Sequence, residues 1–274
     1  MIHRQWIKEI REVSPRVHCI TNYVTAGDVA NMVLAIGGSP IMAQGIREVE
    51  DVTSICGSLV LNMGTLEEER VEAMLLAGKK AGSLHHPVIL DPVGVTASGF
   101  RRNAAQRILR EVRPTVIRGN ASEILVLEQA FSGRETGNVC GVDANDGDGK
   151  ADGREAAISL ADHTGAVVAV TGTTDFVAAP GYLASVYNGH PWMARITGSG
   201  CMLDGIMGVF CALEGASIAE AATAALCAHG LCGELAAAKV MKMGGGTGSF
   251  RMYLMDYMSM LDDEMLERGK KIEI

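Results

Sequence analysis

The sequence predicts a layered α/β fold with a mostly parallel central sheet. Short apolar runs typical of strands alternate with longer segments of helical pattern along the whole chain. The run at residues 87–90 is apolar throughout, as expected for a parallel strand covered on both faces. The expected strands end in Gly, Asn, Asp or Thr, and ligands of such sheets bind beyond the carboxyl ends of the strands.

Turn residues bound the expected strands. Asp91 and Pro92 end the run at 87–90, and Pro180 with Gly181 marks the turn of a hairpin. We expect strands at residues 16–20, 39–43, 58–62, 87–90, 115–118, 166–171, 176–179 and 182–187.

The expected helices carry their own stop signals. Pro15 ends the first helix, and Gly37 with Gly38 is a typical C-terminal stop for the second. Residues 132–153 are polar and rich in Gly and Asp, which indicates a surface excursion, and 244–248 indicates a flexible connector. We expect helices at residues 3–13, 25–36, 48–56, 67–81, 103–112, 123–130, 154–163, 201–213, 217–239 (one or two helices) and 251–268.

Length and composition favour one domain over residues 1–274. The chain shows no linker and no internal repeat, and 274 residues are ample for a sizeable core. Hydrophobic residues make up 48% of the chain but aromatic residues only 4%, with 33 Gly and 15 Met. The core should therefore consist of small aliphatic and Met side chains with many close backbone approaches.

Charge and cysteine usage limit the partners and the compartment. A net charge of −8 argues against nucleic acid or an anionic membrane as the main partner. The seven Cys form no CxxC pair, which indicates reduced thiols and a cytoplasmic location. The charged first segment lacks the apolar core of a signal peptide, and the Ala-rich stretch 221–235 fits a buried helix better than a membrane span.

Polar residues at the expected strand ends are the candidate site. The carboxyl ends of parallel strands lie at one edge of the sheet, so side chains that follow them can meet there. These residues are Asn62, Gly64, Asp91, Arg118, Asn120, Thr171 and Gly172.

The most informative motif is Thr197-Gly198-Ser199-Gly200-Cys201, which an apolar helical run follows at once. A glycine-rich turn that opens a helix offers free N–H groups and the positive helix end to an anion. A thiol in the first turn of such a helix is expected to have a lowered pKa. The alternative is a buried structural Cys on an ordinary helix.

Two carboxylates and an arginine add a possible phosphate and metal site. Asp91 and Glu123 are oxygen donors suited to hydrated Mg²⁺, and Arg118 could grip phosphate oxygens with two N–H groups. Each residue also has a structural alternative: Asp91 and Asn120 can cap turns or helices, and Glu123 suits a first helical turn. The turn after residue 171 fits contact with a nucleotide or an ordinary strand end equally well.

Three other patterns fail as sites. Residues 146–153 suggest a calcium loop, but Lys150 stands where an oxygen ligand is needed and no Glu closes the loop. The run 244–248 lacks the Lys of a phosphate-binding Walker loop. No Ser–His–Asp arrangement follows from the sequence.

Taken together and in this order, the motifs resemble the hydroxyethylthiazole kinase family over most of the chain. The resemblance rests on segments such as Leu61-Asn62-Met63-Gly64-Thr65-Leu66 and Asp91-Pro92-Val93-Gly94. The full set of matching segments is 17–25, 35–43, 61–66, 91–94, 117–124, 141–143, 170–172 and 197–201. Ser199 stands where the family often has Ala, and the stretch 143–153 is more acidic than expected.

The resemblance implies a three-layer ribokinase-like fold, with helices on both faces of the sheet. It implies phosphorylation of the primary hydroxyl of 4-methyl-5-(2-hydroxyethyl)thiazole by ATP, with Mg²⁺ as cofactor, in thiamine biosynthesis or salvage. It also implies a homotrimer whose active sites lie between subunits.

The resemblance assigns roles residue by residue. The thiazole pocket would be lined by Asn22, Val24, Met42, Gly64 and Gly198. Gly198, Gly200 and Cys201 would form the catalytic turn, with Cys201 where related kinases carry an Asp base. Arg118, Asn120, Thr171 and Gly172 would contact ATP, and Asp91 and Glu123 would organise Mg²⁺.

Other functions remain open at this stage. A ribokinase-like kinase of another heterocyclic alcohol, of hydroxymethylpyrimidine or pyridoxal type, would share everything except the pocket lining. A dehydratase of hydrated nicotinamide cofactors would normally carry Asp at position 201. A non-catalytic small-molecule binding protein would need no combination of Asp91, Glu123 and a reactive thiol.

Overall fold

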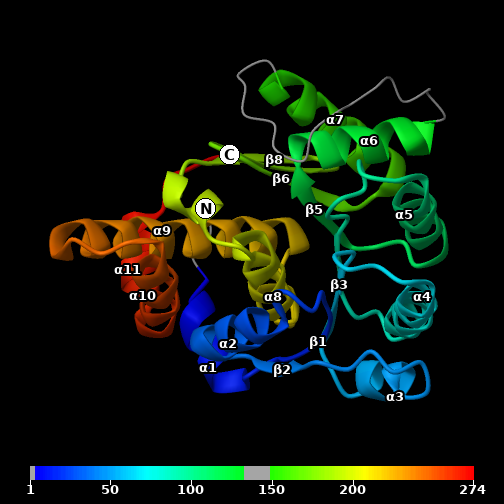
Figure 1. Cartoon of the computed structure of the whole chain (residues 1–274), viewed down its shortest axis with the longest axis horizontal. Coiled ribbons are helices and arrows are strands. Elements are labelled where there is room, and N and C mark those ends of the chain that lie inside the picture. Colours follow the sequence, from blue (N-terminus) through cyan, green and yellow to red (C-terminus); the bar gives the residue numbers. More distant parts are fainter. Residues whose placement is uncertain (1–3, 133–148) are drawn as a thin grey trace.

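A nine-stranded sheet forms the centre of the protein (Figure 1). The computed structural model describes residues 4–132 and 149–274. The strand order is β2-β1-β3-β4-β5-β6-β7-β8-β9, in which β1 to β6 pair in parallel and β7 to β9 antiparallel. The strands are β1 Arg16–Ile20, β2 Ser39–Ile41, β3 Ser58–Asn62, β4 Val88–Asp91, β5 Val116–Asn120, β6 Val167–Thr171, β7 Asp175–Ala179, β8 Tyr182–Val186 and β9 Ile272–Glu273.

Helices cover both faces of this sheet, which gives three layers. One face packs against α2, α8 and α9, and the other against α4 to α7 (Figure 1). Neighbouring residues of β3 point to opposite layers: Val60 belongs to the first core, and Leu59 and Leu61 to the second. The helices are α1 Trp6–Val13, α2 Ala26–Ile36, α3 Val49–Ser54, α4 Glu68–Ser83, α5 Gly99–Glu111, α6 Ala121–Ser132, α7 Gly149–Thr164, α8 Ser199–Cys211, α9 Ile218–Met243, α10 Thr247–Met260 and α11 Asp263–Gly269.

The expected layered fold and its parallel sheet are confirmed. All eight expected strands are present, including the hairpin of β7 and β8. The sequence reading missed the short β9, which pairs with β8, and the 3₁₀ helix Pro191–Arg195. A two-residue strand carries too little apolar pattern to be recognised.

The C-terminal helices differ from expectation. The prediction of a single helix at 251–268 is wrong, because α10 ends at Met260 and a second helix, α11, begins at Asp263. The Asp262 side chain accepts a hydrogen bond from the Met265 N–H and so caps a new helix start. The connector expected at 244–248 is shorter, because Gly244 ends α9 in the left-handed region and α10 already begins at Thr247.

Two other expectations concern α7 and α9. Residues 133–148, which hold most of the expected surface excursion and of the acidic stretch, lie outside the described residues. The next helix begins at Gly149 rather than at residue 154. The helix α9 is long and apolar enough to cross a membrane, but 83% of its most apolar window is buried inside the protein, as expected for a core helix.

Candidate active site

Four parallel strands and one helix deliver the predicted residues to one place. Asn62 ends β3 and lies in register with Asp91, the last residue of β4. Arg118 lies near the end of β5, and Asn22 follows β1. The start of α8 faces this edge, and hydrogen bonds join Cys201 to Asn22 and Asn62. The predicted convergence of remote segments is therefore present.

The glycine turn is shaped by close packing. Gly198 is the N-cap of α8 at φ +83°, and a Cβ there would lie 2.6 Å from Cγ2 of Thr25. A Cβ on Gly200 would lie 2.9 Å from both Nη1 and Nη2 of Arg118. The first N–H groups of a helix have no acceptor within the helix, so this turn presents donors beside a guanidinium.

Arg118 bridges the sheet and α8 through two buried ion pairs. Its Nη2 lies 2.7 Å from Oδ2 of Asp91, and its Nε lies 2.8 Å from Oδ1 of Asp204. Burial opposes the guanidinium charge, but Asp204 and Asp91 outweigh it and raise the pKa of Arg118. Among the described residues Nη1 takes part in neither ion pair, and both terminal nitrogens lie beside the glycine turn, so N–H groups remain for an anion while the two ion pairs stay intact.

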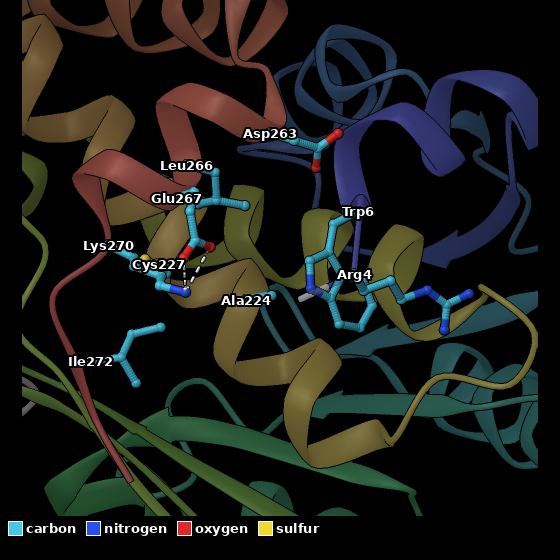
Figure 2. A pocket seen from close by; sticks show the side chains of 9 residues that line it. All are labelled: Arg4, Trp6, Ala224, Cys227, Asp263, Leu266, Glu267, Lys270 and Ile272. Carbon is cyan, nitrogen blue, oxygen red and sulfur yellow. Dashed lines mark hydrogen bonds and ion pairs between the residues drawn. The ribbon is translucent and has the colours of Figure 1, made fainter. Parts of the chain in front are cut away.

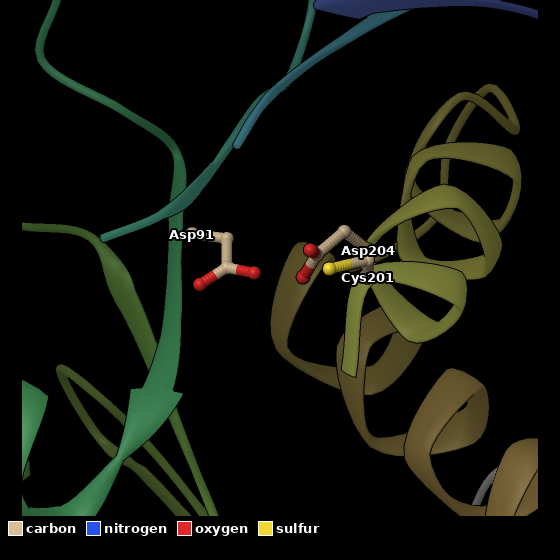
Figure 3. A group of neighbouring side chains, drawn as sticks. All are labelled: Asp91, Cys201 and Asp204. Carbon is tan, nitrogen blue, oxygen red and sulfur yellow. The ribbon is translucent and has the colours of Figure 1, made fainter. Parts of the chain in front are cut away.

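Cys201 belongs to this polar cluster rather than to the hydrocarbon core. Its Sγ lies 3.3 Å from the Nδ2 atoms of both Asn22 and Asn62. The sulfur also lies within 4.8 Å of carboxylate oxygens of Asp91 and Asp204 (Figure 3). These contacts favour the site interpretation over a purely structural Cys.

The expected lowering of the Cys201 pKa is wrong. Burial raises the pKa of the thiol, and the carboxylates of Asp204 and Asp91 raise it further. Thr25 and Arg118 act in the opposite direction but do not outweigh these effects. The Cys201 thiol, beside the glycine turn, therefore keeps its proton near neutral pH.

Hydrogen bonds and close packing hold Asn22, Asn62 and Gly64 together. Nδ2 of Asn22 and the Gly64 N–H each donate to Oδ1 of Asn62 at 3.0 Å. A Cβ on Gly64 would lie 2.6 Å from Cβ of Asn22, so only glycine permits this approach. By contrast, Val24 and Met42 are 64% and 39% exposed, so most of the Val24 surface is open to solvent in a single chain.

Asp91 and Glu123 hold backbone loops with the same oxygens that could serve a metal. Oδ1 of Asp91 accepts from the Val93 N–H, and Glu123 accepts from the N–H groups of Gly94 and Asn120, all at 3.0 Å. Each of these oxygens keeps one lone pair, and hard carboxylate oxygens suit Mg²⁺ that retains water ligands. The donor set therefore fits Mg²⁺ held largely through water.

Burial raises the pKa of Asp91 well above its usual range. The Arg118 charge opposes this rise, and the Asp204 carboxylate adds to it. Two carboxylates thus compete for one guanidinium inside the protein. The guanidinium of Arg118 is therefore already paired before any anion binds.

Asn120, Thr171 and Gly172 lie on neighbouring strand ends. Asn120 pairs in register with Thr171, and its Oδ1 accepts from the Glu123 N–H at 2.9 Å, which confirms the capping interpretation. The Thr171 hydroxyl donates to the Gly119 carbonyl at 3.3 Å. The Gly172 N–H donates to Oδ1 of Asp175, whose pKa burial raises to about 7.

Sequence reasoning missed Asp204. This side chain is fully buried, pairs with Arg118 and accepts from Nδ2 of Asn62 at 3.2 Å. The available signal was its spacing: three residues after Cys201 on a helix, it lies on the same face. An acidic residue inside an otherwise apolar helix, pointing toward the sheet, was the sign of a buried partner.

Two cavities of the described chain lie away from this cluster. One, of about 20 Å³, lies between α1, α9 and α11 and is lined by Trp6, Cys227 and Lys270 among others (Figure 2). It has room for about one water molecule and not for a nucleotide. Another, of about 330 Å³, is lined by residues of α4 and α5. Neither contains a predicted site residue.

This chain is similar to known proteins over nearly its whole length. The model of the hydroxyethylthiazole kinase family matches residues 7–264. The hydroxyethylthiazole kinase of Desulfovibrio desulfuricans is 48% identical over 265 residues, covering 92% of this chain and 91% of that protein. The one of Clostridium acetobutylicum is 45% identical, with 98% of both chains covered.

Solved structures agree with the fold and the family. The structure of a hydroxyethylthiazole kinase protein from Pyrococcus horikoshii superposes with a TM-score of 0.87 at 31% identity, covering 98% of this chain and 96% of that chain. A ribokinase-like superfamily protein from Enterococcus faecalis, with a TM-score of 0.60 at 14% identity over 95% and 90% of the two chains, shares the ribokinase-like fold alone. The chain belongs to the hydroxyethylthiazole kinase family.

Proposed function

We propose that this enzyme transfers the γ-phosphoryl group of ATP to the primary hydroxyl of 4-methyl-5-(2-hydroxyethyl)thiazole, in thiamine biosynthesis or salvage. Membership of the family supports the kinase activity and the use of a nucleotide. The observation that carries the proposal is the meeting of Arg118, Asp91 and Cys201 at the glycine-fed start of α8. Phosphoryl transfer is mainly positioning and charge stabilisation, and this edge of the sheet offers both.

The glycine turn is the proposed cradle of the moving phosphoryl group. The N–H groups of residues 198–201 and the positive end of α8 face an incoming anion. Arg118 adds N–H groups of Nη1 and Nη2 beside Gly200, while its two ion pairs hold the guanidinium plane in place. A preorganised donor set of this kind lowers the barrier because it does not reorganise during the reaction.

The nucleotide would lie along the ends of β5 and β6. Arg118, Asn120, Thr171 and Gly172 line that edge, and Asp91 and Glu123 would hold Mg²⁺ through water. Bound Mg²⁺ neutralises charge on the phosphate groups. Asn120 and Glu123 bind each other's backbone and so keep the loop in place.

The alcohol would lie on the opposite side of the glycine turn. Asn22, Val24, Met42, Gly64 and Gly198 would line its pocket. The raised pKa of Cys201 means that its thiol keeps its own proton near neutral pH. We therefore assign Cys201 the task of orienting the hydroxyl, with Gly200 leaving room for Arg118, rather than that of a thiolate base.

A homotrimer with active sites between subunits completes the proposal. The exposed Val24 and Met42 need a further surface to enclose a small heterocycle, and a second copy of the chain would supply it. The proposal treats residues 1–274 as a single kinase domain in the cytoplasm, with no nucleic acid or membrane partner. The one continuous sheet and the net charge of −8 support these points.

Release of ADP in a coupled assay tests the function. The purified enzyme with ATP and Mg²⁺ is given the thiazole alcohol, hydroxymethylpyrimidine or pyridoxal in parallel. The proposal expects the thiazole alcohol to have the highest kcat/KM. A higher value for either other alcohol would assign the enzyme to a different acceptor, and no ADP with any of them would leave a binding protein.

A further inference from the structure

Arg70 is a buried cation with no carboxylate partner among the described residues. It lies in the first turn of α4 and is 4% exposed, yet no ion pair forms at its guanidinium. Its Nη2 is buried without a hydrogen-bond partner. Burying such a group costs free energy unless other contacts offset the loss of water. The neighbours of Arg70 therefore indicate what the residue is for.

One set of these neighbours is the turn that carries Gly64. Nη1 of Arg70 donates to the carbonyls of Gly64 and Thr65 at 3.3 and 3.2 Å, and to Oγ1 of Thr65 at 2.8 Å. Thr65 has φ +44°, a left-handed conformation that is unfavourable for a β-branched residue. Such a backbone persists only when surrounding contacts fix it, and Arg70 supplies three of them.

The other neighbour is the aromatic ring of Tyr23. The guanidinium carbon of Arg70 lies 4.1 Å from the ring centroid, which is cation–π geometry. The Tyr23 N–H donates to Oγ1 of Thr65 at 3.3 Å, and the Tyr23 hydroxyl accepts from Nε2 of Gln44 at 3.2 Å. Although Tyr23 is 60% exposed, its backbone N–H and its hydroxyl are thus both held by hydrogen bonds.

These contacts join three segments that are remote in sequence. Tyr23 stands between Asn22 and Val24, Thr65 follows Gly64, and Gln44 comes two residues after Met42. The contacts of Arg70 and Tyr23 are therefore made at Gly64 itself or one or two positions away from a residue of the proposed alcohol pocket.

We propose that Arg70 and Tyr23 are positioning residues that hold the alcohol pocket in its binding shape before the alcohol arrives. The inference rests on the proposed function, because that function defines the pocket. Neither residue touches the reacting atoms in this scheme. Their effect is to spare the alcohol the cost of ordering the 22–24, 42–44 and 64–65 segments on binding.

This role predicts a particular kinetic signature. Loosening the pocket should raise the KM for the alcohol while the KM for ATP and kcat stay near wild type, because the phosphate cradle is built from other segments. For Arg70→Ala we expect an alcohol KM about tenfold higher. Arg70→Lys should restore part of the loss, since an ammonium can reach Thr65 but cannot replace the planar fork.

The experiment measures steady-state kinetics for the wild type and five variants, with whichever alcohol the wild type phosphorylates. The variants are Arg70→Ala, Arg70→Lys, Tyr23→Ala and the double variant Tyr23→Ala/Arg70→Ala, and the control is Arg11→Ala. Arg11 also binds backbone carbonyls, those of Ser259 and Leu261, but away from the pocket segments. Because Arg70 and Tyr23 are in contact, the double variant should raise the alcohol KM by less than the product of the single effects.

Each outcome decides the question. A rise confined to the alcohol KM, absent in Arg11→Ala, supports the inference. Unchanged alcohol KM in both Arg70→Ala and Tyr23→Ala, or equal rises for alcohol and ATP, would overturn it. Should Arg70→Ala fail to fold, the exposed Tyr23→Ala carries the decision alone. Failure of the wild type to phosphorylate the thiazole alcohol would count against the proposed function only, because the same measurement is then made with the preferred alcohol.

Discussion

Replacement of Gly200 by Ala tests how α8 positions Arg118. The added Cβ would lie 2.9 Å from Nη1 and Nη2 of Arg118 and 3.2 Å from Cζ. Its contacts with the two nitrogens would be about 0.5 Å shorter than ordinary contact at ~3.4 Å. Arg118 has little freedom to retreat, because ion pairs to Asp91 and Asp204 hold Nη2 and Nε.

The expected loss follows from this geometry. Either α8 moves its first turn away from the sheet or Arg118 gives up an ion pair, and overpacking of this kind costs about 1–3 kcal/mol of unfolding free energy. Both movements displace Nη1 relative to the N–H groups of the turn. Misplacement near 1 Å lowers the rate about 10²-fold, so we expect kcat/KM of Gly200→Ala to fall by about that factor.

Kinetics and thermal unfolding of Gly200→Ala are compared with those of Gly82→Ala. Gly82 lies in the last turn of α4, and a Cβ there would meet nothing within 4 Å. This control should keep wild-type kinetics and gain slightly in stability, as helical Gly→Ala changes do. Wild-type kcat/KM and Tm in Gly200→Ala would refute the view that the close approach of Gly200 sets the position of Arg118.

Further predictions concern the buried acidic groups and the thiol. Cys201→Ser should keep kcat/KM within about tenfold of wild type, because a hydroxyl can orient the alcohol as a protonated thiol does; a loss beyond ~10²-fold would assign the thiol a role as base. Asp204→Ala should lower the free energy of unfolding in urea by about 3 kcal/mol, because it leaves Nε of Arg118 buried without a partner. Asp204→Asn should lower the free energy of unfolding by less than half as much, because its amide oxygen still accepts a hydrogen bond from Nε of Arg118. A larger loss for Asp204→Asn than for Asp204→Ala would contradict the role of this hydrogen bond. Asp175→Asn should flatten the pH dependence of the free energy of unfolding. Burial raises the pKa of Asp175 from 3.8 to about 7 in the folded protein. The stabilisation by this protonated carboxyl is therefore complete below about pH 4 and is lost as pH rises through 7. Parallel stability curves for wild type and Asp175→Asn between pH 4 and pH 8 would show that this carboxyl does not control the slope.

Local sequence signals predicted where the site would form. Asn62 and Asp91 end β3 and β4, Arg118 lies two residues before the end of β5, and parallel strands bring such positions to one edge. The glycine turn before an apolar helix predicted the start of α8, with its free N–H groups, beside these strand ends. These inferences depend only on strand direction and helix start, which short sequence patterns specify.

The partners of each group could not be predicted in the same way. The rule that a helix N-terminus lowers a thiol pKa is local, whereas the pKa of Cys201 is governed by burial and by the distant Asp91 and nearby Asp204. Likewise, Arg118 looked free to bind phosphate because its two carboxylates come from β4 and α8. The role of Arg70 could not be predicted because it depends on contacts with Tyr23 and Thr65. These residues meet Arg70 only in the folded chain.

The charge balance of the cluster explains how an acidic protein can bind a triphosphate. Asp91 and Asp204 both pair with Arg118, so its guanidinium already joins the sheet to α8 before any anion binds. Much of the attraction for phosphate would then come from the N–H groups of the glycine turn, from the helix dipole and from Mg²⁺, in addition to Arg118. Removal of Mg²⁺ should therefore strongly lower the affinity for nucleotide, because the paired Arg118 cannot replace the charge of the metal. A site with unpaired arginines would keep most of its affinity for nucleotide without Mg²⁺. Nucleotide titrations with and without chelator distinguish the two, and metal-independent binding would contradict the charge balance derived from these ion pairs.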